Sequence, residues 1–151
     1  MRLISNSVKE TAEIGKKLGR ILEPGDIICL FGNLGSGKTV LAKGIAVGLG
    51  INKKNVISPS FVLMRQHISG RIPLYHFDLY RLKSCEDILA IGYEDYLFAQ
   101  GASVIEWADR LKYLLPKHFL KIELKVAGQL RRELKLIPKG AHYGKILKGL
   151  K

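Results

Sequence analysis

The stretch FGNLGSGKTVLAKG, residues 31–44, constrains the fold of this chain more than any other, because it places a glycine-rich segment between two apolar runs. Glycine loses more conformational entropy on folding than any other residue, so such a dense group of glycines is costly unless the bare backbone has a task. Residues 27–31 (IICLF) have the length and composition of a strand buried on both faces. Residues 39–50 have the apolar spacing of a helix that stops at Gly50. The sequence therefore predicts a buried strand, a glycine loop and a helix, in that order.

The loop matches the phosphate-binding pattern G-x-x-x-x-G-K-[ST] at every fixed position, from Gly32 to Thr39. In this pattern backbone N–H groups meet phosphate oxygens, and the following helix adds its free N-terminal amides and its dipole. Lys38 would bring a positive charge to the β- and γ-phosphates, and the Thr39 hydroxyl can bind Mg²⁺. The pattern thus indicates a nucleoside triphosphate site rather than a flexible turn. The nucleotide contacts that we expect are Gly32, Asn33, Leu34, Gly35, Ser36, Gly37, Lys38, Thr39 and Val40.

Two carboxylates are candidates for completing a metal site beside this loop. Glu106 ends the apolar run ASVIE, which is typical of a Walker B strand and would place the carboxylate beside Thr39. Asp78 lies in YHFDLYRL, on a predicted strand that is too polar for the centre of a sheet. For each, the alternative is a surface acid paired with a nearby Lys or Arg. The pattern leaves open which of the two binds the metal and which positions the attacking water.

The other segments indicate a single α/β domain over residues 1–151 with a central mixed sheet, a parallel core and antiparallel hairpins. Ser7 and Glu10 form a capping-box pattern at the start of a helix within residues 5–22. Further expectations are a hairpin (61–68 with 72–79), two short helices broken near Gly92 (84–101), a buried strand (102–107), a second hairpin (118–126 with 131–139) and a basic tail at about 140–151.

Composition excludes several classes of protein. Neither of the two cysteines lies in a pattern typical of a metal site, and both are expected as free thiols of a reducing cytoplasm. The four histidines are scattered, and each is expected to be structural or exposed. No apolar run approaches the roughly 18 residues that a membrane helix needs. The net charge is +12, and residues 110–151 carry 12 of the 25 Lys and Arg residues but only 2 of the 13 Asp and Glu residues.

Several segments together resemble the TsaE (YjeE) family of small bacterial ATPases that act in threonylcarbamoyladenosine modification of tRNA. The segments are GNLGSGKT, SPSF (58–61), YHFDLYRL (75–82), GYEDYL (92–97) and VIEWAD (104–109), in the order and spacing of that family. The resemblance extends from the first helix to about residue 135. It implies a P-loop NTPase-like three-layer fold that binds ATP or ADP with Mg²⁺.

The resemblance also implies roles for individual residues. Asp78 and Glu106 match the essential acids of the family, so that both are expected to be catalytic with Lys38 and to hold the metal with Thr39. Ser60 takes the position of a family threonine and keeps its hydroxyl, so it is expected to contact the nucleotide in a phosphate- or water-sensing role. Further nucleotide contacts are expected from Trp107, whose alternative is a core aromatic, and from Arg131 or Arg132, of which we prefer Arg132. No residue stands out as an arginine finger: Arg81 is a candidate, but a surface or salt-bridge role is expected for it.

The implied partners are TsaB and TsaD, of which TsaD transfers the threonylcarbamoyl group to adenosine 37, with tRNA contacted indirectly through their complex. ATP hydrolysis would reset that complex between turnovers, and the protein is expected in the cytoplasm without a membrane contact. Two alternatives remain open at this point. One is a small-molecule P-loop kinase, whose lid could lie in residues 108–118, and the other is nucleic-acid binding through the basic C-terminal region.

Overall fold

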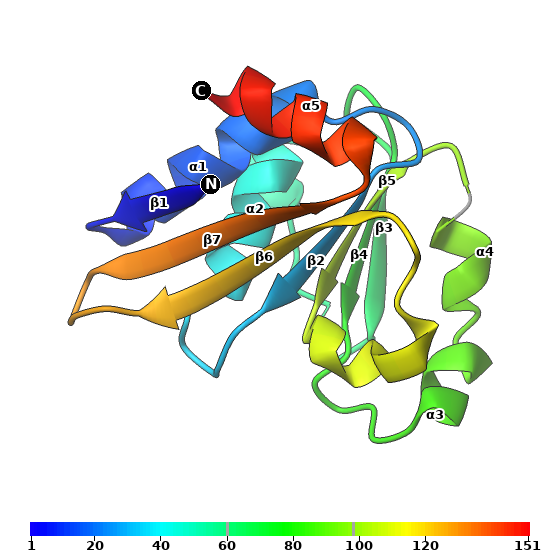
Figure 1. Ribbon diagram of the computed structural model, residues 1–151. Helices are drawn as coiled ribbons and strands as arrows, with labels where there is room; N and C mark the ends of the chain where they lie inside the picture. Colours follow the sequence, from blue (N-terminus) through cyan, green and yellow to red (C-terminus); the bar gives the residue numbers. More distant parts are fainter. Residues whose placement is uncertain (60, 98) are drawn as a thin grey trace.

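A computed structural model describes residues 1–59, 61–97 and 99–151 of the chain, which form a central seven-stranded sheet between two layers of helices (Figure 1). The strand order is β1-β7-β6-β2-β5-β4-β3. The strands are β1 (Arg2–Ser5), β2 (Ile27–Phe31), β3 (Met64–His67), β4 (Leu74–Asp78), β5 (Ala102–Glu106), β6 (Phe119–Val126) and β7 (Arg132–Lys139).

The helices lie on both faces of this sheet. One face packs against α1, α2 and α5, and the other packs against α3, α4 and the 3-10 segment η2 (Figure 1). The helical elements are α1 (Val8–Ile21), α2 (Lys38–Gly48), η1 (Lys53–Asn55), α3 (Cys85–Ala90), α4 (Tyr93–Leu97), η2 (Ala108–Leu114) and α5 (Ala141–Leu150).

Strand directions confirm the expected mixed sheet with a parallel core. Strand β2 pairs in parallel with β5 on one side and with β6 on the other, and β4 extends the parallel part beyond β5. Strands β3, β7 and β1 add antiparallel pairs at the two edges. The carboxyl ends of β2, β5 and β4 therefore meet at one edge, where open α/β sheets bind ligands.

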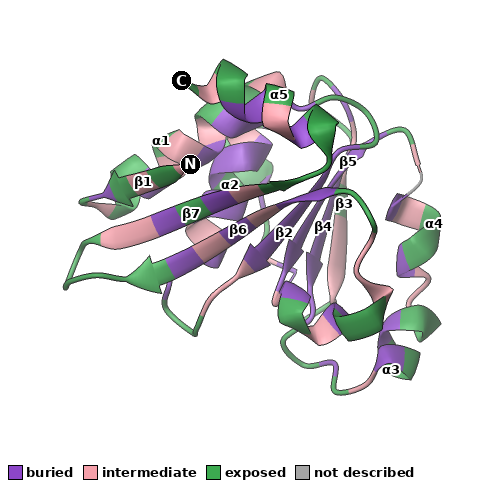
Figure 2. Cartoon of the chain, viewed as in Figure 1, coloured by how far each residue is buried: buried purple, intermediate pink, exposed green. Residues whose placement is uncertain are grey.

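Local sequence explains most of these elements. At the start of α1, the Ser7 hydroxyl accepts the amide of Glu10 at 3.0 Å, and the Glu10 carboxylate accepts the amide of Asn6 at 2.6 Å. Gly92 lies between α3 and α4 at a φ of +71°, which confirms the predicted break. Strands β4 and β5 are buried along their whole length (Figure 2).

Strand β4 lies next to the edge strand β3 and away from the sheet centre, as its polar composition suggested. It is nevertheless buried throughout, and its His76 and Asp78 have polar partners there. Two other elements differ from the expectations. The first hairpin is shorter than expected, and β3 begins only at Met64. Residues 140–151 do not form a tail: they contain helix α5, which buries Tyr143 and Ile146.

Within the described residues, none of the helices is both long enough and apolar enough to cross a membrane. Both cysteines, Cys29 and Cys85, are free thiols, as expected, and both are buried. Burial raises the pKa of the Cys29 thiol far above its ordinary value.

Candidate functional site

The glycine loop connects β2 to α2 at the carboxyl edge of the parallel strands. Gly37 is the residue before the helix and has a φ of +103°, a left-handed conformation that favours glycine. A side chain at Gly32 would put its Cβ 2.5 Å from the Ser36 hydroxyl and 2.6 Å from the Leu124 carbonyl oxygen. These two glycines therefore allow the loop to fold tightly against β6 and to turn its backbone into the first turn of α2.

Lys38 folds back over this loop. Its ammonium group donates to the carbonyl oxygens of Gly32 and Asn33, the latter at 3.0 Å, and lies 3.5 Å from the hydroxyl of the buried Ser36. The same ammonium lies 4.0 Å from the centre of the Trp107 ring. Lys38 thus stabilises the loop in a form that is already curved around a positive charge.

Burial lowers the pKa of Lys38 below its ordinary value, while the nearby carboxylates of Glu106, Asp109 and Asp78 act in the opposite direction. Trp107 follows β5 directly and has a left-handed φ of +57°, which is uncommon for a side chain of this size. This backbone conformation brings the indole ring from the end of β5 to the lysine of the loop. The aromatic ring and the ammonium group form a cation–π contact.

Glu106 connects β5 to the start of α2. The Thr39 hydroxyl donates a hydrogen bond of 2.6 Å to Oε1 of Glu106. In the parallel register of β4 and β5, Asp78 lies directly opposite Glu106, so both carboxylates lie on the same sheet face. One oxygen of Asp78 accepts the amide of Tyr80 at 3.0 Å. The structure thus brings together Lys38, Thr39, Asp78 and Glu106, as the sequence suggested.

His76 is a member of this cluster that the sequence analysis did not single out. Its Nε2 lies 2.5 Å from Oε2 of Glu106, and its side chain is completely buried. The alternation of a strand puts His76 on the same face as Asp78, two residues further on, and that spacing was visible in the sequence. The contact with Glu106 was not visible, because it depends on the pairing of β4 with β5.

A pocket of about 280 Å³ opens in front of the loop. The loop and α2 provide one wall, including the half-buried Val40, and Arg132 and Leu130 of the β6–β7 hairpin provide another. Arg132 donates from Nη2 to the Gly35 carbonyl oxygen at 3.2 Å, whereas its neighbour Arg131 is exposed. The lining residues are Val8, Thr11, Gly35, Gly37, Lys38, Thr39, Val40, Leu130 and Arg132.

The remaining predicted residues lie around this cluster or outside it. Asn33 and Leu34 are exposed at the tip of the loop, and Leu34 shows 77% of its surface. Arg81 is exposed and stacks on Phe61, with 4.6 Å from its guanidinium carbon to the ring centre. Ser60 lies outside the described residues.

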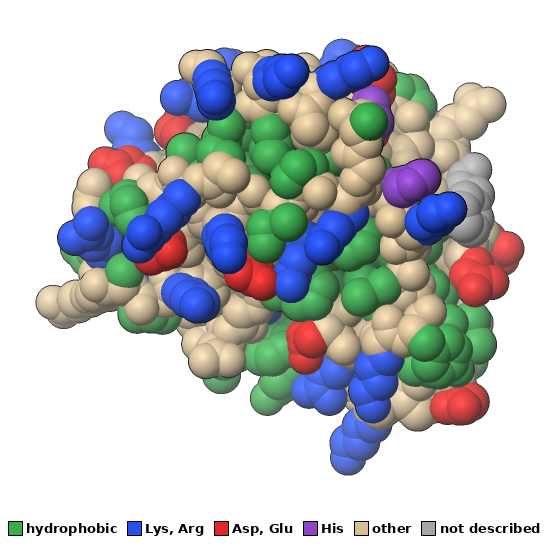
Figure 3. Space-filling view, in the orientation of Figure 1, with side chains coloured by type: hydrophobic (Ala, Val, Ile, Leu, Met, Phe, Trp, Pro, Cys, Tyr) green, Lys and Arg blue, Asp and Glu red, His purple; other side chains and the backbone are tan. Residues whose placement is uncertain are grey.

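The basic C-terminal region forms an exposed surface on β6 and β7. Figure 3 shows Lys and Arg side chains distributed over these strands and over α5. The two carboxylates of the strands are paired: Glu133 lies 2.8 Å from Arg2, and Glu123 lies 2.8 Å from Lys121. Alternating charges with short ion pairs are typical of a solvated sheet face.

Comparison with known proteins agrees with this geometry. Residues 5–134 match the family described as threonylcarbamoyl adenosine biosynthesis protein TsaE. The chain is 42% identical over 134 residues to the tRNA threonylcarbamoyladenosine biosynthesis protein TsaE of Treponema pallidum, with 89% of this chain and 98% of the relative covered. It is 38% identical over 135 residues to the protein of the same name from Bacillus subtilis, with 89% and 84% covered.

The fold agrees as well. The crystal structure of YdiB from Bacillus subtilis superposes with a TM-score of 0.87 at 32% sequence identity, over 99% of this chain and 93% of that one. The glycine loop, the Thr39–Glu106 contact and the paired register of Asp78 and Glu106 all lie within the matched range. The chain therefore belongs to the TsaE family of tRNA threonylcarbamoyladenosine biosynthesis proteins.

Proposed function

We propose that this protein is a Mg²⁺-dependent ATPase that acts with TsaB and TsaD in the formation of threonylcarbamoyladenosine at position 37 of tRNA. The observation that carries the ATPase assignment is the 2.6 Å hydrogen bond from Thr39 to Glu106, because it joins a phosphate-binding loop to a buried carboxylate on the neighbouring strand. P-loop ATPases use such a pair of hydroxyl and acid beside the nucleotide phosphates.

The donor set of the site fits Mg²⁺. Thr39, Glu106 and Asp78 offer only oxygen atoms, which are the ligands that this hard cation prefers. The Thr39 hydroxyl donates its proton to Glu106, so its oxygen lone pairs remain directed elsewhere and can hold the metal. Mg²⁺ supplies positive charge to the phosphate oxygens when it is bound.

Glu106 and Asp78 then have different tasks. Each oxygen of Glu106 has one hydrogen-bond partner, Thr39 or His76, so Glu106 orients the hydroxyl that holds the metal and keeps lone pairs for the metal itself. Asp78, directly opposite in the register, is the acid that positions the attacking water. Lys38 exchanges the carbonyl oxygens of Gly32 and Asn33 for oxygens of the β- and γ-phosphates when nucleotide binds.

The pocket in front of the loop is the proposed site of the base and ribose. Val8 and Leu130 expose 62% of their surfaces each and lie in its lining, so an aromatic base can cover them. Arg132 reaches the loop from the hairpin and lies where the guanidinium can contact ribose or phosphate oxygens. This arrangement supports a bound nucleotide that extends from α1 to the loop.

A hydrolytic role is favoured over that of a small-molecule kinase. By sequence, a kinase lid could lie in residues 108–118. This segment contains η2, which packs Ala108 and Leu111 into the core. These two buried residues hold the segment to the core, which disfavours a lid that opens and closes over an acceptor. The proposed task is therefore to reset the TsaB–TsaD complex between turnovers, with hydrolysis slow in the isolated protein and faster on the complex.

The test measures phosphate release from Mg-ATP with and without TsaB and TsaD, for the native protein and for Glu106→Gln. We expect slow release alone, stimulation by the partners and a loss of at least about 100-fold in the variant, because one member of a catalytic unit is disabled. Reconstituted modification with Glu106→Gln should stop after one turnover. Full multiple-turnover modification by the variant would contradict the proposed role, and phosphate transfer to a metabolite would support the kinase instead.

A further inference from the structure

His76 is a completely buried histidine that the proposed reaction does not itself require. Its Nε2 lies 2.5 Å from Oε2 of Glu106, on the oxygen opposite to the one that accepts the Thr39 hydroxyl. Its other nitrogen, Nδ1, is buried and has no hydrogen-bond partner among the described residues. The imidazole is therefore held by Glu106 through a single nitrogen.

Basic side chains lie on the same sheet face as His76. Arg65 of β3 is its direct partner in the antiparallel register, so both side chains lie on the same face of the sheet. His67 lies two residues beyond Arg65 on that face. A carboxylate oxygen accepts hydrogen bonds, so the Nε2–H of His76 is the donor to Glu106.

This donor fixes the carboxylate of Glu106. With Thr39 on Oε1 and His76 on Oε2, rotation of the carboxylate would break a part-buried hydrogen bond on one side and a buried one on the other. Outer partners of this kind orient the groups that contact a metal, and their loss commonly costs 10–100-fold in affinity or activity. We propose that His76 is a positioning residue, which holds Glu106 in the rotamer that orients the Thr39 hydroxyl. This inference rests on the proposed function.

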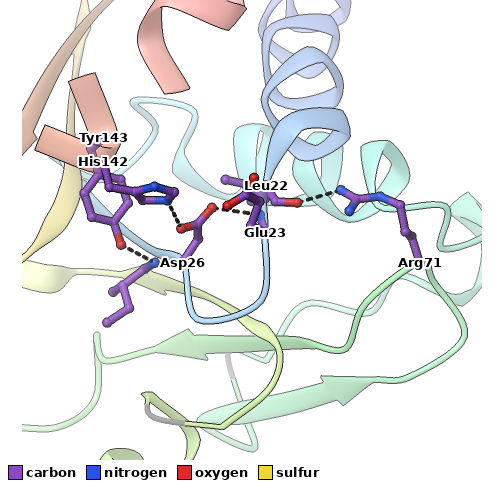
Figure 4. Close-up of polar contacts among 7 residues, drawn as sticks. Leu22, Glu23, Asp26, Arg71, His142 and Tyr143 are labelled. Carbon is purple, nitrogen blue, oxygen red and sulfur yellow. Dashed lines mark hydrogen bonds and ion pairs between the residues drawn. The ribbon is translucent and has the colours of Figure 1, made fainter. Parts of the chain in front are cut away.

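A histidine beside a carboxylate can also be purely structural, and the chain offers a matched example. His142 of α5 lies 2.6 Å from Oδ1 of the buried Asp26, where it helps to fasten α5 to the turn before β2 (Figure 4). That pair lies at the opposite end of β2 from the glycine loop, because Asp26 precedes the strand and the loop follows it. His142→Leu is thus a control that removes a histidine–carboxylate contact without touching the site.

The experiment compares His76→Leu, His76→Gln and His142→Leu with the native protein. Phosphate release is measured in single turnover at saturating ATP, so that weak activity is still visible. Mg²⁺ affinity of the ADP complex is measured separately through the fluorescence of Trp107, the only tryptophan. We expect His76→Leu to lose 10–100-fold in rate and in Mg²⁺ affinity, with the Mg²⁺-free affinity for ADP unchanged. His76→Gln, whose amide can donate in place of Nε2, should recover most of both.

A double-mutant cycle with Glu106→Gln tests whether the effect of His76 on the rate is exerted through Glu106. If His76 acts through Glu106, His76→Leu should change the rate by less than about twofold in the Glu106→Gln background. An undiminished effect there would overturn the proposal. A native rate of phosphate release in His76→Leu would also overturn the proposal. Equal losses of rate in His76→Leu and His76→Gln, in proportion to lowered melting temperatures, would overturn it as well. If the native protein releases no phosphate, the ATPase assignment fails, and the Mg²⁺ affinities still decide the role of His76.

Discussion

At the scale of single residues, the two adjacent arginines of the β6–β7 hairpin show what the sequence can and cannot specify. A contact with the nucleotide was expected from Arg131 or Arg132. Neighbouring residues on a strand point to opposite sides of the sheet, so an error of one position in the register selects the wrong arginine. In the structure β7 begins at Arg132, whose guanidinium reaches the Gly35 carbonyl oxygen of the glycine loop, whereas Arg131 is exposed. Only the pairing with β6 fixes that register, and pairing is not a local property.

Under the proposed function, Arg132→Ala should weaken ADP binding by about tenfold, because the proposed charge-assisted hydrogen bond to the nucleotide would be lost. Arg131→Ala is the matched control, since it removes the same charge one residue away from an exposed position. Titration calorimetry of both variants with ADP checks the difference. Equal effects of the two substitutions would show that only the general positive charge matters.

At the scale of elements, helices α1 and α2 approach each other through glycines spaced four residues apart. A Cβ on Gly19 would lie 2.2 Å from the Ile45 carbonyl oxygen, and a Cβ on Gly44 would lie 2.3 Å from the Ala12 carbonyl oxygen. Gly15 and Gly48 are as tightly enclosed. This contact places Thr11 of α1 beside the first turn of α2, and thus shapes the wall of the pocket.

Gly44→Ala should lower the free energy of unfolding by about 1–3 kcal/mol, because the added methyl group meets backbone that cannot move aside easily. The matched control is Gly144→Ala in α5, where nothing lies within 4 Å of the added carbon. There alanine should stabilise the helix by up to about 1 kcal/mol. Urea denaturation of both variants measures the two effects, and a loss in both would point to a cause other than close packing.

Elements with a strong local pattern were predictable, and elements that depend on distant partners were not. The capping box at Ser7, the strand–loop–helix of the glycine motif and the break at Gly92 all follow from their own residues. Strand β1 has only four residues, and it exists because β7, more than 100 residues later, pairs with it. Helix α5 contains two glycines, and its burial against α1 and β7 outweighs that poor propensity.

At the scale of the whole molecule, the C-terminal segment belongs to the core. Helix α5 buries Tyr143, Ile146 and Leu147, and the Tyr143 hydroxyl accepts the amide of Ile27 at 2.9 Å (Figure 4). Deleting this segment would therefore disturb the fold, so a deletion cannot show whether its positive charge binds nucleic acid. A charge test must use substitutions at its exposed lysines.

Deletion of residues 140–151 should cost on the order of 5 kcal/mol, since three large side chains lose their burial. That approaches the whole stability of a typical domain, so cooperative melting should disappear. Replacing the exposed Lys145, Lys148 and Lys151 by Glu should leave melting nearly unchanged. The same triple variant, assayed for tRNA binding over a range of salt, tests the nucleic-acid alternative: native binding by this variant would argue against it.

The buried phenol of Tyr143 links stability to alkaline pH. Burial raises the pKa of Tyr143 to about 12, above its ordinary value near 10. Between these values the unfolded chain releases the proton and the folded chain keeps it, so stability falls as pH rises from about 10 to 12. Denaturation at several pH values should show Tyr143→Phe losing less stability over this interval than the native protein, by on the order of 2 kcal/mol. Parallel curves would contradict the assignment.

The β6–β7 turn has a consequence for how proteins of this kind diversify. The glycine loop connects β2 and α2, whereas Leu130 and Arg132 come from a separate hairpin whose turn is closed by the Ala127–Arg131 backbone hydrogen bond. In the proposed complex with nucleotide, an insertion or exchange within that turn would change the side chains beside the base and leave the sequence of the phosphate-binding loop unchanged. Under the proposed assignment, preference for one nucleobase over another can evolve in a few surface residues while the chemistry stays intact.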